Sequence, residues 1–132
     1  MNKLEESFLR LCLKPRVECD LPGRLRLSFN KYRLLPKEAL PYLHYIRDVL
    51  ELLPGVTGAE INPRIGTVLI RYDANITAAR AILRWVGIVV DEGIRISNED
   101  IWQGADEKEL EDIVRKRLIL RLPPAKRRLN HA

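Results

Sequence analysis

The residues best suited to soft-metal or nucleophilic chemistry are Cys12, Cys19, His44 and His131. Thiolates and imidazoles bind transition metals, and a thiolate beside a base acts as a nucleophile. Such metal sites usually carry ligands at a short fixed spacing, and none is present here. A composite site for a transition-metal ion at Cys12, Cys19 and His44 stays open as an alternative, and His131 lies in the C-terminal tail.

The two cysteines also have a simpler interpretation. Cys12 continues the apolar stripe of a helix expected over residues 4–14, and Cys19 alternates with Val17 and Leu21 along an expected strand. Free cysteine behaves as a small hydrophobic residue, so we expect both thiols to be structural. Two cysteines are also too few for a disulfide scaffold, which suits a reducing compartment.

Acid–base and phosphate chemistry find little support in the sequence. Paired carboxylates project away from each other when they are adjacent in a helix or strand, so we interpret them as solvated surface. The glycine-containing turn at residues 54–58 lacks the spacing and the lysine of a phosphate-binding loop. We therefore predict that the chain is not an enzyme. The acidic pairs are Glu5-Glu6, Glu99-Asp100 and Glu111-Asp112.

Positive charge is concentrated at the C-terminus. The formal net charge is +5, but positions 115–132 carry seven basic residues and no acidic one. Positions 1–114 then hold 16 of the 23 basic residues and all 18 acidic residues. Cations that alternate with large aliphatics are typical of helices on anionic membranes or acidic partners. The other interpretation is a packed helix followed by a basic tail. The interaction residues expected here are Arg115, Lys116, Arg117, Arg121, Lys126, Arg127 and Arg128.

Arg24 and Arg26 are the other expected interaction residues. They project from the polar side of the strand expected over residues 17–29, in which Pro22-Gly23 predicts a bulge or an edge position. A solvated, charge-mixed sheet face explains them, and so does a surface that docks another protein, because arginine is enriched in interfaces. Both interpretations remain open from the sequence.

Hydrophobic periodicity predicts the elements that position these residues. After the first helix and strand, an apolar stripe indicates a helix over residues 39–53. Two β-branched runs, 56–61 and 67–72, form a hairpin; a helix then follows over residues 77–90. A short strand at residues 93–96 and a helix at residues 106–120 complete the chain.

This order predicts an α+β fold, a ferredoxin-like βαββαβ sandwich with added N-terminal and C-terminal helices. We expect a helix at residues 1–14, the sandwich at 15–97, a helical extension at 98–122 and a basic tail at 123–132. The most apolar run, residues 81–90, is too short to span a bilayer and contains Arg84, and no secretory signal is recognised. We expect a cytoplasmic protein, with association to a membrane through its C-terminal helix as an alternative.

Three motifs in order resemble divergent heavy-metal-associated domains. These are LPGRLRL at residues 21–27, LPGV at residues 53–56, and Asn62 followed by GTVLIRYD at residues 66–73. Such domains occur in or beside P-type metal-transporting ATPases, and the resemblance covers about residues 15–96. The best-known members bind a soft metal through a Cys-x-x-Cys loop after the first strand. Here that loop, residues 30–36, reads NKYRLLP and holds neither cysteine nor histidine.

The resemblance without its ligand pair implies a non-catalytic adaptor in metal homeostasis. It would act by protein–protein or membrane-surface binding, with a metal-transporting ATPase as the partner. A metal chaperone or sensor using an unorthodox Cys/His site is an alternative. Single-stranded nucleic-acid binding is another but is disfavoured, because strand 67–72 has aliphatics where bases would stack on aromatics. Pairing of an edge strand with a second copy would give a homodimer.

Overall fold

The computed structural model describes residues 10, 13–29, 45–97, 99 and 106–123. It shows an α+β fold in which one four-stranded antiparallel sheet packs against helices. The strands are β1 (Arg16–Leu21), β2 (Arg24–Ser28), β3 (Val56–Asn62) and β4 (Thr67–Tyr72). The helices are α2 (Tyr45–Leu50), α3 (Ala79–Ser97) and α5 (Glu107–Leu120).

The sheet has the order β1-β2-β4-β3. Both β2 and β3 pair antiparallel with β4, so they run parallel to each other with β4 between them. α2 lies in the connection between these two parallel strands. The structure confirms the β3–β4 hairpin and the C-terminal helix α5 that the sequence predicts. Both were predictable because their β-branched runs, turn residues and apolar spacing are local signals.

The single strand predicted over residues 17–29 is wrong, because the chain reverses at Pro22-Gly23. Leu21 pairs with Arg24 on either side of this two-residue turn. Gly23 has a φ of +80°, and proline followed by such a residue is typical of a type II turn. β1 and β2 are therefore the two arms of a hairpin, and a bulge in β1 lies between Val17 and Cys19.

The strand predicted over residues 93–96 is also wrong, because these residues form the last turns of α3. Ile94 and Ile96 are both buried, and each lies four residues, about one helical turn, after a residue of α3 that is itself at least partly buried, Val90 and Glu92. A short apolar alternation fits a helix and a strand equally well. The sheet position beside β2 is occupied by β1, so no strand is needed there.

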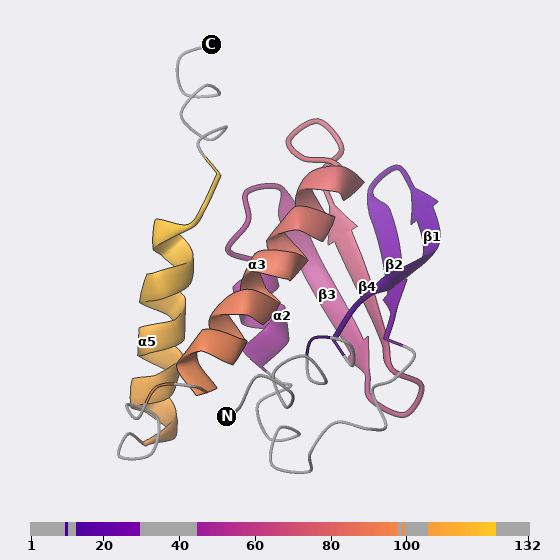
Figure 1. Ribbon diagram of the computed structural model, residues 1–132. Helices are drawn as coiled ribbons and strands as arrows, with labels where there is room; N and C mark the ends of the chain where they lie inside the picture. Colours follow the sequence, from indigo (N-terminus) through magenta and orange to yellow (C-terminus); the bar gives the residue numbers. More distant parts are fainter. Residues whose placement is uncertain (1–9, 11–12, 30–44, 98, 100–105, 124–132) are drawn as a thin grey trace, which may run out of the picture.

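The core lies between one face of the sheet and the helices, with α3 crossing that face and α5 beside α3 (Figure 1). Leu25 and Leu27 of β2 and Ile70 of β4 are fully buried there. The indole Nε1 of Trp85 donates a 2.9 Å hydrogen bond to the carbonyl oxygen of Val49, which ties α3 to α2. Leu118 of α5 belongs to the same core, so the C-terminal helix is packed into the fold.

Most of the predicted N-terminal helix and residues 39–44 of the predicted second helix lie outside the described residues, as does the tail from residue 124. Among the described helices, none is both long and apolar enough to cross a bilayer.

Candidate functional site

The sheet face opposite the helices carries three arginines on its two central strands. Leu25 and Leu27 point into the core, so the alternating Arg24 and Arg26 project from the other face. Arg71 of β4 lies directly opposite Arg24 in the register. We call the part of this surface around the three arginines the open face; it is formed by Cys19, Leu21, Arg24, Arg26, Gly58, Glu60, Leu69 and Arg71.

Two rows of paired residues cross the open face. One row runs from Leu21 through Arg24 and Arg71 to Gly58, and the next runs from Cys19 through Arg26 and Leu69 to Glu60. A Cβ built on Gly58 would meet no heavy atom within 4 Å, so the surface beside Arg71 is unobstructed. The face thus presents cations around exposed aliphatic side chains rather than a cavity.

The charges on the open face are unequally compensated. Arg71 pairs with Glu60 on the neighbouring strand β3. Nε of Arg26 lies 3.4 Å from a carboxylate oxygen of Glu18 on β1. Arg24 forms no ion pair with the described residues, yet its direct cross-strand neighbour is another arginine. Like charges placed directly opposite each other destabilise a sheet, so Arg24 and Arg71 form an unfavourable pair in the isolated chain.

Arg117 and Arg121 of α5 have a different role, because α3 holds them in ion pairs. Nε of Arg117 and Nη1 of Arg121 lie 2.9 and 3.0 Å from the two carboxylate oxygens of Glu92. Glu92 is only 4% exposed. Its Oε2 has no aligned hydrogen bond, so its stabilisation comes from the nearby guanidinium charge.

Two further carboxylates complete the α3–α5 cluster. Asp91 lies 2.8 Å from Arg121, 2.9 Å from Arg95 and 3.1 Å from Arg10. Nη1 of Arg117 donates to both carboxylate oxygens of Glu99, at 2.9 and 2.8 Å. Glu99 was expected to be solvated surface; that expectation is wrong, because the chain after α3 brings it back to α5.

The cluster shifts the ionisation of its members in favour of the charged forms. The hydrogen bond from Arg121, aided by Arg10 and Arg95, holds the pKa of Asp91 below its ordinary value despite some desolvation. The hydrogen bond to Glu99 raises the pKa of Arg117, and the bonds to Asp91 and Glu92 raise that of Arg121. Asp91, Arg117 and Arg121 are therefore held in their charged forms, and their ion pairs fix how α5 sits on α3.

Of the remaining basic residues of the C-terminus, the structure describes two. Arg115 and Lys116 are exposed on α5 and form no ion pair with the described residues. Lys126, Arg127 and Arg128 lie outside the described residues. The seven expected interaction residues of the C-terminus therefore separate into two engaged with α3, two free on α5, and three in a segment to which the structure assigns no position.

Cys19 is half-buried and faces the open side beside Arg26, so its expected place on the apolar face of a long strand is wrong. Residues paired across the hairpin project to the same side of the sheet, and a two-residue turn pairs odd-numbered residues with even-numbered ones. Cys19 and Leu21 therefore lie on the side of Arg26 and Arg24. Cys12 and His44 lie outside the described residues. Within the described ranges no group of three or more Cys, His, Asp or Glu is placed to hold a metal ion.

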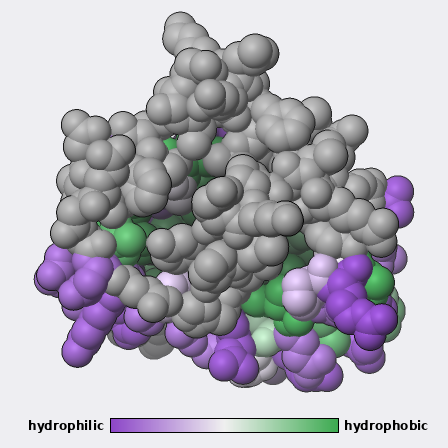
Figure 2. Space-filling view, turned by 90° about the horizontal axis from the view of Figure 1, so that it is seen from below, coloured by the Kyte–Doolittle hydropathy of each residue, from purple (hydrophilic) through white to green (hydrophobic). Residues whose placement is uncertain are grey.

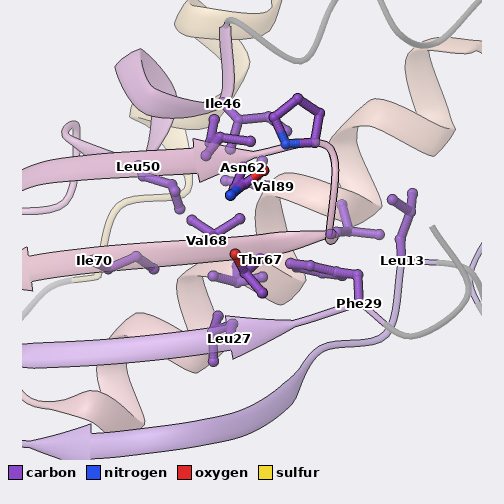
Figure 3. Close-up of a pocket in the computed structure, with 15 residues that line it drawn as sticks. Leu13, Leu27, Phe29, Ile46, Leu50, Asn62, Thr67, Val68, Ile70 and Val89 are labelled. Carbon is purple, nitrogen blue, oxygen red and sulfur yellow. The ribbon is translucent and has the colours of Figure 1, made fainter. Parts of the chain in front are cut away.

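An apolar cavity of about 120 Å³ lies between the sheet and the helices, near the β3–β4 turn. Leu27, Val68 and Ile70 reach it from the strands, with Leu50 from α2 and Val89 from α3 (Figure 3). Seen from this end, green apolar residues lie among purple hydrophilic ones (Figure 2). None of the described lining residues has a titratable side chain, so these residues offer hydrophobic contact rather than acid–base chemistry.

Sequence reasoning missed the α3–α5 cluster and the Arg71–Glu60 pair. The spacing of Arg117 and Arg121, four residues apart, puts both on one side of a helix. The adjacent Asp91 and Glu92 close an apolar stretch of α3. Together these patterns signal a buried ionic contact, although only the packing of α5 on α3 shows that they meet.

Comparisons with known proteins return no match: no family model, no curated protein and no solved structure corresponds to this chain.

Proposed function

We propose that the chain is a non-catalytic interaction module, and that an acidic segment of a partner protein docks on the open face. The observation that carries this proposal is the opposition of Arg24 and Arg71 across two central strands. This arrangement costs stability in the free chain. A carboxylate-bearing partner would relieve the repulsion and accept hydrogen bonds from both guanidinium groups.

The surroundings of the two arginines favour a protein over a nucleic acid. Leu21 is 53% exposed and Leu69 is half-buried between the cations, so the face combines aliphatic contact with charge. Single-stranded nucleic acids are bound by bases stacking on aromatic rings. Tyr72, the aromatic residue of the central strands, is buried on the helix side, and its hydroxyl faces the carbonyl oxygen of Leu21 at 3.4 Å.

The class of partner comes from the resemblance to heavy-metal-associated domains. We propose an accessory role in metal homeostasis, in which the module binds a cytosolic domain of a metal-transporting P-type ATPase. The fold that we propose is a ferredoxin-like variant: β2, β3 and β4 take the positions of its first, second and third strands, and β1 replaces the fourth. The alternation of parallel β2 and β3 around β4 supports this assignment.

The test is a charge reversal that separates binding from stability. Arg24→Glu places a carboxylate opposite Arg71, so we expect the free energy of unfolding to rise by up to about 1 kcal/mol. We also expect binding to the purified cytosolic domains of metal-transporting ATPases, measured by calorimetric titration, to fall at least ten-fold. Arg84→Glu, an exposed position on α3, is the charge-matched control and should bind as the wild type does.

Two outcomes would contradict different parts of the proposal. Equal affinity of the Arg24→Glu and wild-type proteins would remove the open face as the docking surface. Absence of binding to every ATPase domain tested would remove the proposed partner class. Amide chemical-shift changes with a peptide of glutamate and valine would then show whether the open face still binds acidic segments.

A metal chaperone or sensor using Cys12, Cys19 and His44 remains the second candidate. Cys19 lies half-buried on the open face, where a ligand is reachable. Native mass spectrometry of the reduced protein with copper(I), zinc and iron(II) tests this function. A stoichiometric complex that is lost in Cys12→Ser/Cys19→Ser would support it, and the absence of any complex would contradict it.

Homodimer formation along β1 is also testable. The edge strand carries exposed Val17 and Leu21, but a bulge interrupts its pairing pattern and Glu18 and Asp20 add charge. Bulges and charges on an edge strand oppose open-ended pairing. Light scattering across a range of protein concentrations distinguishes a monomer from a dimer.

A further inference from the structure

The last two turns of α5 expose large aliphatic side chains beside exposed cations. Leu120 is 86% exposed and Ile119 is 45% exposed. Arg115 and Lys116 are exposed one turn earlier. We call these four residues the α5 patch. Leu120 is far more exposed than the other exposed large hydrophobic residues of the described chain, so its position calls for a physical explanation.

The orientation of the α5 patch is fixed by the opposite side of the helix. Arg117 and Arg121 are held by Glu92, Glu99 and Asp91, and Leu118 is fully buried. At 100° per residue, this side and the α5 patch lie on opposite flanks of the helix. A small rotation cannot hide Leu120 without breaking the ion pairs, so the exposure of the patch is built into the packing.

The outward side of α5 becomes purely basic toward its C-terminus. Glu109 and Asp112 lie with Lys108 in its first half, whereas its second half carries Arg115 and Lys116. Asp112 is one turn from both cations, yet no ion pair joins it to either of them. On the outward side of α5, basic and large apolar side chains therefore occur together only at the C-terminal end. A binding partner of these residues would touch only that end of the helix.

We propose that the α5 patch is a contact site for a phospholipid membrane with anionic headgroups. Leu120 and Ile119 would enter the boundary between headgroups and acyl chains, while Arg115 and Lys116 would reach the lipid phosphates and carboxylates. Two aliphatic side chains without an aromatic anchor make a poor core for a protein interface of about 800 Å² per partner. A bilayer accepts such shallow insertion, and charge complementarity completes the contact.

This contact is expected to be reversible and sensitive to salt. Stable membrane anchoring takes two signals, and the α5 patch supplies one of modest strength. Screening at high ionic strength weakens the contribution of exposed cations. The proposal is independent of docking on the open face, because the two surfaces share no residue and belong to different elements.

Co-sedimentation of the full chain with vesicles tests the proposal. Vesicles of phosphatidylcholine alone are compared with vesicles that also contain phosphatidylglycerol, and binding is expected only to the latter. Arg115→Ala/Lys116→Ala should lower the partition coefficient about thirty-fold, since each cation near an anionic surface raises this coefficient roughly five-fold. Leu120→Asn should lower it about ten-fold through lost insertion.

The charge-matched control is Arg80→Ala/Arg84→Ala, which removes two exposed cations from α3 and should leave the partition coefficient within about two-fold of the wild type. Circular dichroism and thermal unfolding confirm that each variant is folded. A chain ending at Pro123 measures the contribution of the tail and should retain patch-dependent binding. Wild-type binding by the Arg115→Ala/Lys116→Ala and Leu120→Asn variants would overturn the proposal. Absence of binding to anionic vesicles, or complete loss on tail removal, would overturn it too.

Discussion

Glu92 is the acidic residue on which the contact between α3 and α5 depends. It is the only charged side chain among the described residues that is almost completely buried, and it faces both Arg117 and Arg121. A buried carboxylate is tolerated when opposite charge is close, and removal of either partner is costly. Glu60 makes a comparable ion pair with Arg71 on the surface, where water screens the attraction.

Glu92→Gln should therefore destabilise the protein more than Glu60→Gln. We expect the first substitution to lower the free energy of unfolding by about 1–3 kcal/mol, because it leaves two guanidinium groups with fewer acceptors. The second should cost at most about 1 kcal/mol, since the Glu60 side chain is 63% exposed. Urea unfolding of both variants measures the difference, and equal losses would show that the buried pairs add no more stability than the surface pair.

Asp91 gives the stability a defined pH dependence. Arg121, Arg10 and Arg95 lower its pKa in the folded chain below the ordinary value of 3.8. Its contribution is fully present above the pKa of the unfolded chain and is lost as the pH falls through the lower folded value. The stability difference between the wild type and Asp91→Asn should be constant near neutral pH and shrink below about pH 4. A difference that widens on acidification would contradict this sign.

The β1–β2 hairpin is the element in which the structure differs most from the sequence prediction. Its turn requires Gly23 in a left-handed conformation, and a Cβ there would lie 3.1 Å from the carbonyl oxygen of Tyr72. The same turn sets the parity that puts Leu21 beside Arg24 on the open face. The hairpin thus controls both the edge of the sheet and the composition of the candidate docking surface.

Gly23→Ala should lower the free energy of unfolding by about 1 kcal/mol or more, because alanine is strained at this φ. Gly58→Ala is the control, since its Cβ would enter open space at a backbone angle that alanine adopts. It should be neutral or slightly stabilising. Thermal unfolding of the two variants provides the comparison, and a neutral Gly23→Ala would argue against the tight turn.

The described chain as a whole behaves as one packed unit from β1 to the end of α5. Leu118 joins the core that the sheet, α2 and α3 also form, and the ion pairs of α5 close the same contact. The C-terminal helix is therefore both a structural part of the domain and the carrier of the α5 patch. Loss of membrane binding after removal of the whole helix would not separate these two roles.

Two truncations separate them. A chain that ends at Pro123 should keep the melting temperature of the full chain within about 2 °C, because its last helix and buried leucine are intact. A chain that ends at Arg115 loses Leu118 and both cluster arginines, so it should be destabilised by at least several kcal/mol. Scanning calorimetry measures both. A stable Arg115 truncation would show that α5 is dispensable for the fold.

The elements whose signals are local could be predicted from the sequence. The β-branched runs of β3 and β4, the apolar stripe of α3 and the charge gradient of α5 each lie within one segment and follow from its periodicity. The positions of Arg24 and Arg26 on the polar side of a strand were also correct.

Only the tertiary structure decided how these segments meet. Alternation across residues 17–29 fits one strand and a hairpin, but reversal at Pro22-Gly23 moves Cys19 to the opposite side. Residues 93–96 form the end of α3, although their short apolar alternation also fits a strand, and β1 occupies the sheet position beside β2. The basic residues of α5 divide between ion pairs and solvent because α3 fixes its rotation. The sequence of each segment determines the periodicity of its apolar residues, whereas strand register and helix packing determine which side chains remain exposed and can bind a partner.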